Sequence, residues 1–354
     1  MDFREALAEV AAAVNRLIAA DPFPEKVAPD YLAAAVRDYP GRGGKRLRPA
    51  LVCWSGGLLG APREKLLFPA VATEVFHNWT LVHDDIIDRD DLRRGAPTAH
   101  VTLARAVRER FPEADAPRLG ADFAILCGDL QQAWANDLLL RGITAGVRAE
   151  VIAGCARNLQ RRGGRELIAG EALDVELSLR DPVTVTPEEI RRMIDGKTGA
   201  LLRFAAETGT MIALDTPDPA HETVRRLGEF ARLCGLAFQL RDDHLGIFGD
   251  ARLGKPLGND LREAKPTLLL VTAFRLADEA ARKELRSLLG RPDTDAAVLD
   301  RAREIMTACG AAKALETEMQ ETAERAADML AAFPANDCRQ WLLDFAAATV
   351  ARRS

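Results

Sequence analysis

The stretch from His83 to Gly95 constrains the fold of the chain more than any other. It follows an apolar run with helical spacing and places five aspartates and three arginines within thirteen residues, H-D-D-I-I-D-R-D-D-L-R-R-G. On a helix, Asp84 and Asp88 lie one turn apart on one face, with Asp85 beside them. Carboxylates this close repel one another unless a cation lies among them. Mg²⁺ suits this pattern, because it takes one or two carboxylates together with phosphate oxygens.

A second acidic pair lies far along the chain. Asp242 and Asp243 stand in F-Q-L-R-D-D-H-L-G-I-F-G-D, within another apolar segment with helical spacing. One D-D-x-x-D could equally be a solvated acidic helix end followed by a basic loop, but two such clusters in one helical chain argue against that reading. Arg93 and Arg94, which follow the first cluster, offer planar donors suited to phosphate. The pattern therefore predicts metal ions that are bound together with a phosphorylated ligand.

The composition excludes several classes of protein. With 354 residues, 48% of them hydrophobic and 29% charged, the chain is long enough for a large globular core. Its net charge of −5 argues against nucleic acid as the main partner. Six cysteines are scattered without a C-x-x-C pair, which indicates reduced thiols in a cytoplasmic protein. No apolar run is long enough to predict a membrane span or a secretion signal.

Helical spacing dominates the chain, and the strand signal is poor throughout. Because no linker-like boundary or repeat interrupts the helical pattern, residues 1–354 are predicted to form a single all-α domain. The polar residues 93–119 are interpreted as a surface elaboration. Thr186, Pro187 and Glu189 have the pattern of a capping box, which places a helix start there. Helices are expected at about 2–20, 29–38, 45–59, 68–88, 121–141, 145–162, from 187 and at 222–248, and then over 267–354 with breaks near 290–292 and at 334.

Basic residues are informative where they cluster. Lys45, Arg46 and Arg48 follow a glycine-rich turn and open an apolar helix, where cations are unfavourable unless an anion binds. The alternative is a basic helix start on the surface. His77 lies two turns before the first aspartate on nearly the same face, and is either a core histidine or a ligand. Lys197, in an apolar stretch, either extends its amine to solvent or pairs with an anion.

Taken together, these motifs resemble one family. D-D-x-x-D with R-R-G after it, G-K-R-L-R-P upstream and F-Q-x-R-D-D downstream are similar to the trans-isoprenyl diphosphate synthases, or polyprenyl synthetases, over about residues 40–270. The resemblance implies an all-α helical bundle of the isoprenoid synthase type with a central active-site cavity, a homodimer and three Mg²⁺ ions. It also implies that an allylic diphosphate ionises, that isopentenyl diphosphate attacks the resulting cation, and that a proton is then lost.

The resemblance also implies a role for each matching residue. The metal ligands would be Asp84, Asp85, Asp88, Asp242 and Asp243. The allylic diphosphate would be held by Arg93, Lys197, Lys255 and Lys265, the last two in a mobile lid, and isopentenyl diphosphate by Lys45, Arg48, His77 and Arg94. Thr198 and Gln239 would border the developing cation. Two positions depart from the family pattern: Glu171 replaces a common glutamine, and Gly246 stands where a third aspartate is common, so that water is expected to complete the second metal site.

Trp79 bears on the length of the product. It lies five positions before Asp84, about 7.5 Å along a helix axis, where the resemblance implies that a bulky side chain forms the floor of the substrate-binding pocket. Phe76 and Thr80 lie closer to the face of Asp84, so a core tryptophan is the alternative. With tryptophan as the floor we expect a C20 product, ahead of C15 and of C25 or longer.

Three rival functions are weighed against this one. A class I terpene cyclase also uses D-D-x-x-D, but it usually pairs this motif with an N-S-E type motif and needs no second diphosphate group such as Lys45, Arg48 and Arg94. A non-catalytic subunit of a heteromeric synthase would be expected to have lost one aspartate pair, and both pairs are present. The third rival is a helical protein whose acidic clusters have no function.

Overall fold

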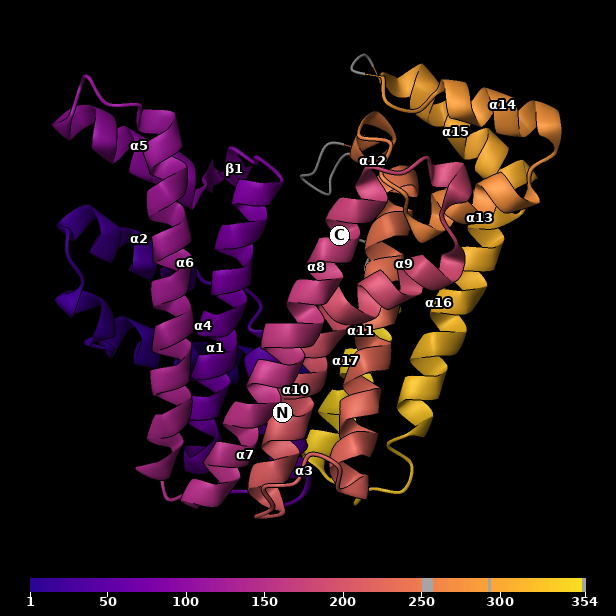
Figure 1. The fold of residues 1–354 in the computed structure, drawn as a ribbon. Coiled ribbons are helices and arrows are strands. Elements are labelled where there is room, and N and C mark those ends of the chain that lie inside the picture. The colour runs from indigo at the N-terminus through magenta and orange to yellow at the C-terminus, as the bar shows by residue number, and fades with distance from the viewer. Residues whose placement is uncertain (250–256, 292–293, 352–354) are drawn as a thin grey trace. The chain divides into compact units, whose positions relative to one another are not determined.

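A computed structural model describes residues 1–249, 257–291 and 294–351. In this part of the chain the protein is helical apart from its loops and one hairpin of two short strands (Figure 1). The prediction of an all-α protein is confirmed. The chain divides into two compact units, which we describe separately: unit 1 contains residues 1–158 and 205–224, and unit 2 contains residues 159–204 and 225–354. That these form one domain stays a prediction.

Unit 1 is built from helices with one hairpin inserted. Its elements are α1 (Phe3–Ala20), η1 (Phe23–Lys26), α2 (Asp30–Gly41), α3 (Leu47–Leu58), α4 (Arg63–Ile87), β1 (Leu92–Arg93), β2 (Ala96–Pro97), α5 (Ala99–Arg110), α6 (Ala116–Leu140), η2 (Arg141–Ile143), nearly all of α7 (Ala149–Leu159) and most of α10 (Ala200–Ala213).

Unit 2 is helical throughout its described residues. Its elements are η3 (Gln160–Leu167), α8 (Ile168–Ser178), η4 (Pro182–Thr184), α9 (Pro187–Ile194), η5 (Asp195–Gly199), nearly all of α11 (Glu222–Phe248), α12 (Asn259–Arg262), α13 (Leu268–Leu276), α14 (Glu279–Ser287), α15 (Ala296–Ala308), α16 (Ala311–Asp328) and α17 (Asp337–Ala351).

Local sequence sets several helix boundaries. At the start of α1, Asp2 and Glu5 each accept the other's backbone N–H, a reciprocal capping box that satisfies two free donors. Thr186 and Glu189 form the same arrangement before α9, as predicted. The predicted bounds of α11 are confirmed. In contrast, α2 runs three residues further than predicted and includes Tyr39.

The long helices α4 and α6 form the centre of unit 1, where they pack side by side (Figure 1). Every residue of α4 from Pro69 to Phe76 is buried, so this part of the helix is enclosed on all sides. Nearer its end, Val82 and Asp85 are still buried, whereas Ile87 and the capping residue Asp88 are exposed. The aspartate cluster therefore lies where α4 leaves the core of unit 1.

Residues 93–119, expected as a surface elaboration, contribute to the core of unit 1. Part of this stretch forms α5, whose buried Ala99, Leu103 and Val107 recur every four residues and give one apolar face. This helix packs on α6. A Cβ at Gly120 of α6 would lie 2.5 Å from the carbonyl oxygen of His100, so the close approach of the two helices requires glycine there. The short apolar face lies between Pro97 and Pro112 in an otherwise polar stretch, which the sequence analysis interpreted as surface.

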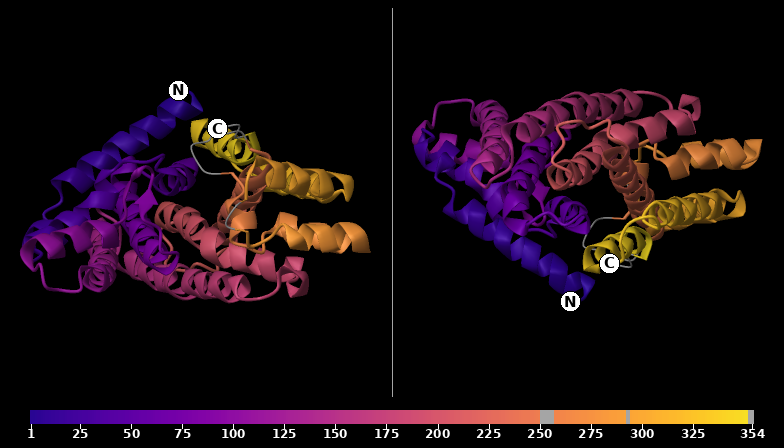
Figure 2. Two further views of the ribbon diagram at one scale, coloured as in Figure 1. Left: turned by 90° about the horizontal axis from the view of Figure 1, so that it is seen from above. Right: turned by 90° about the horizontal axis from the view of Figure 1, so that it is seen from below.

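The carboxyl-terminal helices of unit 2 share one core. Helix α16 packs against α13, α15 and α17 (Figures 1 and 2). The predicted breaks near 290 and 334 are confirmed, and further breaks occur at 277–278 and 309–310. All six cysteines lie among the described residues, and none of them forms a disulfide there. Within the same residues, no helix has the length and apolar character needed to cross a membrane.

Candidate active site

The hairpin after α4 directs two neighbouring arginines to different partners. Its two-residue loop, Arg94 and Gly95, has positive φ at both positions, as in the type I′ turns that favour glycine. Arg93, at the end of β1, turns back to the aspartates of α4. Arg94 instead reaches the glycine-rich turn before α3, where its Nη1 donates to the carbonyl oxygen of Gly43 at 3.0 Å. The R-R-G motif thus connects the acidic cluster with the basic turn inside unit 1.

Arg93 and Tyr39 hold the first aspartate cluster in place. Arg93 donates from Nε to Oδ1 of Asp85 at 2.5 Å and from Nη2 to Oδ2 of Asp84 at 3.0 Å. The Tyr39 hydroxyl donates to Oδ2 of Asp85 and accepts the backbone N–H of Ala99 at 3.1 Å. Burial raises the pKa of Asp85, although the hydrogen bonds from Tyr39 and Arg93 oppose that shift. Burial and the neighbouring Asp85 also raise the pKa of Tyr39, so this hydroxyl keeps its proton and remains a donor.

The three aspartates of the first cluster therefore differ in how readily they could meet an ion. Asp85 is fully buried, and both of its oxygens accept hydrogen bonds from protein groups. Asp84 is partly exposed, and Asp88, which caps α4, is exposed. Asp84 and Asp88 are thus better placed to meet a metal ion, whereas Asp85 is placed to orient Arg93.

Unit 1 also gathers cations around a histidine. Burial lowers the pKa of His77 well below its ordinary value, and four arginines add to this shift, led by Arg48 and Arg94. Burial and the nearby Arg94 lower the pKa of Arg48 to about 10, although Glu74 opposes the shift. The Nε of Arg48 is buried and has no hydrogen-bond partner among the described residues. A neutral imidazole among guanidinium groups favours an anion such as a diphosphate.

Arg46 plays a structural role that its neighbours do not share. It is buried and pairs with Glu74 of α4 at 2.5 Å. Its other donors reach Oδ1 of Asn15 at 2.9 Å and the carbonyl oxygen of Pro40 at 2.6 Å. Arg46 therefore ties α1, α2 and α4 together. Lys45, the residue before it, is exposed on the turn.

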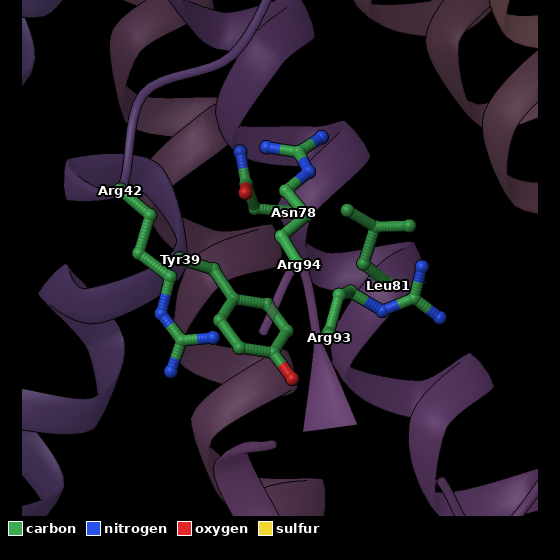
Figure 3. Close-up of a pocket in the computed structure, with 6 residues that line it drawn as sticks. All are labelled: Tyr39, Arg42, Asn78, Leu81, Arg93 and Arg94. Atoms are coloured by element: carbon green, nitrogen blue, oxygen red, sulfur yellow. The ribbon is translucent and has the colours of Figure 1, made fainter. Parts of the chain in front are cut away.

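A pocket opens beside these groups in unit 1. Figure 3 shows the Tyr39 ring between Arg42 and Arg93, and the Arg42 guanidinium lies 4.7 Å from the ring centroid. Arg42, which follows the last residue of α2, is itself held by Asp38 of that helix. Because its lining is rich in arginine, the pocket suits an anionic ligand. The lining residues are Tyr39, Arg42, Asn78, Leu81, Arg93 and Arg94.

In unit 2, two glycines allow α8 and η5 to cross closely. A Cβ on Gly170 would lie 2.2 Å from the backbone nitrogen of Lys197, and one on Gly196 would lie 2.7 Å from the Cα of Gly170. The segment η5 is a π-helical turn, a form frequent at functional sites. This crossing brings Glu171 and Asp174 of α8 to the side chain of Lys197.

Asp174 holds two lysines that the sequence assigned to diphosphate binding. Oδ2 of Asp174 lies 2.7 Å from Nζ of Lys197 and 3.0 Å from Nζ of Lys265. Glu171, at the position where glutamine was expected, lies 3.0 Å from Lys197. Burial alone would raise the pKa of Asp174, but Lys265 and Lys197 lower it below its ordinary value. The Asp174 carboxylate is therefore held in its charged form between the two ammonium groups.

A chain of hydrogen bonds connects the K-T motif with the second aspartate pair. Thr198 Oγ1 donates to Oε1 of Gln239 at 3.2 Å, and Gln239 Nε2 donates to Oδ1 of Asp243 at 2.9 Å. Burial raises the pKa of Asp243 to about 7, and the nearby Asp260 adds to the shift, whereas Gln239 and Lys265 oppose it. The remaining predicted lysine, Lys255, lies outside the described residues.

Comparison with known proteins settles the family. The family model described as polyprenyl synthetase matches residues 29–306. The chain belongs to the polyprenyl synthetase family. It is 36% identical to a geranylgeranyl diphosphate synthase of Saccharolobus solfataricus, over 75% of this chain and 73% of that one. It is 33% identical to a geranylfarnesyl diphosphate synthase of Aeropyrum pernix, over 88% and 90% of the two chains.

The fold is that of this family as well. The crystal structure of a geranylgeranyl pyrophosphate synthase from Corynebacterium glutamicum, complexed with isoprenyl diphosphate and magnesium, matches with a TM-score of 0.83 and 30% identity, over 100% of both chains. The predicted isoprenoid synthase fold is therefore confirmed. As a polyprenyl synthetase, this protein is a trans-prenyltransferase.

The carboxylates of this polyprenyl synthetase fit the metal ion on which its family depends. Their oxygens are the hard ligands that Mg²⁺ prefers, and the buried Asp243, whose pKa is raised, is a group that a cation would stabilise. Among the described residues, no three histidine, cysteine or acidic side chains are grouped closely enough to hold an ion by themselves. That suits Mg²⁺, which completes its shell with water and substrate phosphates.

Trp79 lies inside unit 1. It is 6% exposed, and its ring packs against Phe76 at 4.7 Å and His83 at 5.6 Å between ring centroids. Its indole Nε1 is buried without a hydrogen-bond partner among the described residues. These contacts suit a core tryptophan as well as a pocket floor, so its role in product length stays a prediction.

Two residues that organise the site in this polyprenyl synthetase were not predicted. Tyr39 was expected in a loop, and no local pattern points to its long-range contact with Asp85. Asp174 had a weak signal: it lies four residues after Gly170, so the glycine at the crossing and the carboxylate share one helix face.

Proposed function

We propose that this trans-prenyltransferase uses Mg²⁺ to condense isopentenyl diphosphate with an allylic diphosphate, head to tail, and that its main product is geranylgeranyl diphosphate. The observation that carries this proposal is the group of cations around the neutral His77 in the unit that also contains the first aspartate cluster. A terpene cyclase needs metal-binding aspartates but no second diphosphate site. The cations around His77 therefore favour an enzyme that binds two diphosphate substrates.

In the proposed reaction, Arg48, His77 and Arg94 bind isopentenyl diphosphate, with Lys45 on the turn before them. Their charges require no metal ion to hold a diphosphate. Arg48 and Arg94 supply planar donors, and the neutral imidazole accepts or donates a hydrogen bond without adding charge. The substrate is thereby oriented with its double bond free to attack.

The allylic diphosphate is assigned to the aspartate clusters and to Arg93, Lys197, Lys255 and Lys265. We propose three Mg²⁺ ions with Asp84, Asp85, Asp88, Asp242 and Asp243 as the candidate ligands, and Asp85 as the least accessible of them. Bound Mg²⁺ would stabilise the charge that develops on the leaving diphosphate. Lys197 and Lys265 share Asp174, so a diphosphate would draw on two ammonium groups that are already oriented. Thr198 and Gln239 would border the allylic cation.

The proposed chain length rests on Trp79 and on the relatives. Several relatives are named geranylgeranyl diphosphate synthases, while others are named geranylfarnesyl and farnesyl diphosphate synthases. A tryptophan at the floor favours a short product, C20 ahead of C15 or of C25 and longer. A non-catalytic role in a heteromeric synthase is the alternative, and the presence of both aspartate pairs argues against it.

We also propose that the enzyme is a cytoplasmic homodimer. Its six cysteine thiols, none of them in a disulfide, fit a reducing compartment. Helix α6 exposes Ile125, Leu126 and Leu140, which are apolar side chains that a second copy could cover. Light scattering on the purified protein would distinguish one chain from two.

Incubation with labelled isopentenyl diphosphate and each allylic primer tests the proposed function. The expected result is a C20 product, formed with Mg²⁺ and abolished by excess EDTA. Absence of any prenyl product from all primers would contradict the proposal, and a C25 or longer product would contradict the chain-length assignment only.

A further inference from the structure

One face of α11 meets the π-helical turn η5, which carries the K-T motif. Arg232, Gly235 and Gln239 recur at intervals of three and four residues, so they lie on the same face of the helix. At one end of this row, Gln239 accepts the hydrogen bond from Thr198, and the proposed reaction places both residues beside the allylic cation. At the other end lies Arg232, which has no part in the proposed chemistry.

Arg232 joins α11 to the first residue of η5. Its Nη1 donates to Oδ1 of Asp195 at 2.6 Å. Its Nε and Nη2 donate to the two oxygens of Glu229, three residues earlier on α11, both at 2.7 Å. Because a guanidinium is rigid and planar, the two bonds to Glu229 direct Nη1 towards Asp195.

Two glycines bring η5 and α11 close enough for this contact. A Cβ on Gly235 would lie 3.2 Å from the Cα of Gly199, the last residue of η5. A Cβ on Gly199 would lie 3.4 Å from Cγ of Arg232 and 3.8 Å from Oδ1 of Asp195. Arg232 therefore lies against both the first and the last residue of the turn.

We propose that Arg232 is a positioning residue for prenyl transfer, which acts through Asp195 on the K-T motif. Lys197 and Thr198 are neighbours in η5 but contact different helices: the lysine reaches α8 and the threonine reaches α11. A return of the turn to α-helical form would remove its extra residue and rotate one part of it against the other by about 100°. The two contacts could not then both be kept. This inference rests on the proposed function, which assigns Lys197 and Thr198 to the allylic substrate.

The charges around Arg232 support this role. Burial raises the pKa of Asp195 and the nearby Glu229 adds to the shift, whereas Arg232 and Arg203 oppose it. Burial would also raise the pKa of Glu229, but the hydrogen bond from Arg232 lowers it below its ordinary value. Arg232 is thus the shared partner of two partly buried carboxylates. Without it they would repel each other, and η5 would be pushed away from α11.

Steady-state kinetics of two carboxylate deletions separate the contact with η5 from the other contacts of Arg232. Asp195→Ala removes the acceptor on η5, and we expect it to lower kcat by about 10- to 100-fold, the cost of misplacing groups near the reacting atoms by about 1 Å. The KM for the allylic diphosphate should rise, while the KM for isopentenyl diphosphate, whose proposed groups lie in unit 1, should stay the same. Glu229→Ala is the matched control. It should impair the enzyme less, because Arg232 still reaches η5.

Substitutions of Arg232 itself test whether the pair acts as a unit. Arg232→Met removes every donor, and adding Asp195→Ala to it should lower kcat no further, because the interaction is already lost. Arg232→Lys keeps the positive charge and should regain part of the kcat that Arg232→Met loses. Circular dichroism and thermal melting show whether each variant is folded. If Asp195→Ala is not folded, Asp195→Asn, which keeps the shape and removes the charge, takes its place.

The outcomes separate this inference from the function on which it rests. Parental kcat and allylic KM in a folded Asp195 variant would show that the pair only stabilises the fold, and the proposed function would stand. An equal rise in KM for both substrates, or an equal loss of kcat in Glu229→Ala, would also contradict the inference. If the parent enzyme itself forms no prenyl product, the proposed function fails and the inference fails with it.

Discussion

At the scale of single residues, the first aspartate cluster depends on a tyrosine from another helix. Tyr39 and Arg93 occupy the two oxygens of the buried Asp85, and Arg93 also reaches Asp84. A buried carboxylate that loses one of its donors is destabilised by about 1–3 kcal/mol or more. Tyr39 is therefore a positioning residue that acts through Asp85 and Arg93.

We predict that Tyr39→Phe lowers kcat by about tenfold and raises the Mg²⁺ concentration needed for half-maximal activity. The KM for isopentenyl diphosphate should not change, because Arg48 and His77 keep their surroundings. Steady-state kinetics with varied Mg²⁺ provide the measurement. Tyr31→Phe is the matched control on the same helix, since its hydroxyl makes no hydrogen bond within the described structure. If Tyr39→Phe and Tyr31→Phe change kcat and the Mg²⁺ requirement equally, Tyr39 does not have the positioning role assigned to it.

Substitution of Arg48 tests which substrate the cations around His77 bind. Arg48→Ala removes a guanidinium next to His77, and the loss of a charged hydrogen bond costs about 1.5–3 kcal/mol, or about 10- to 100-fold in affinity. We expect the KM for isopentenyl diphosphate to rise by this factor while the KM for the allylic substrate stays the same. An equal rise in KM for both substrates, or a rise for the allylic substrate alone, would contradict the assignment of Arg48 to isopentenyl diphosphate.

At the scale of elements, the sequence predicted helices well and their contacts poorly. The bounds of α11 and the capping box of α9 follow from apolar spacing and local hydrogen bonds, which a sequence displays directly. The D-D-x-x-D and R-R-G motifs located Asp84 and Arg93 for the same reason. Tyr39 and Asp174 escaped prediction because their partners lie 46 and 23 residues away in the chain. Such contacts depend on tertiary packing, which no local pattern records.

Helix α4 carries the prediction for product length. Trp79→Ala opens a void in the core of unit 1 and should cost about 3–5 kcal/mol of stability. If the tryptophan forms the pocket floor, the variant will also make longer prenyl diphosphates than the parent. Chromatography of the labelled products gives the answer. Trp134→Ala, at a fully buried tryptophan of α6, is the control that should lose stability without a change in product. A folded Trp79→Ala enzyme with the parental products would make Trp79 purely structural.

At the scale of the whole molecule, the groups assigned to the reaction are divided between the two units. Unit 1 contains the first aspartate cluster and the cations around His77, and unit 2 contains the second aspartate pair and the lysines held by Asp174. Neither unit contains both aspartate clusters. If both units serve one reaction, each aspartate cluster is necessary for prenyl transfer.

The most direct test compares prenyl transfer by Asp84→Ala, Asp242→Ala and the parent under saturating substrates and Mg²⁺. The control is Asp300→Ala, which removes an exposed aspartate of α15. Loss of charge stabilisation at the leaving diphosphate should lower kcat by about 10²- to 10³-fold or more in each of the first two variants, with no change in the control. Near-parental kcat in either folded aspartate variant, or full activity of the parent in excess EDTA, would contradict the account.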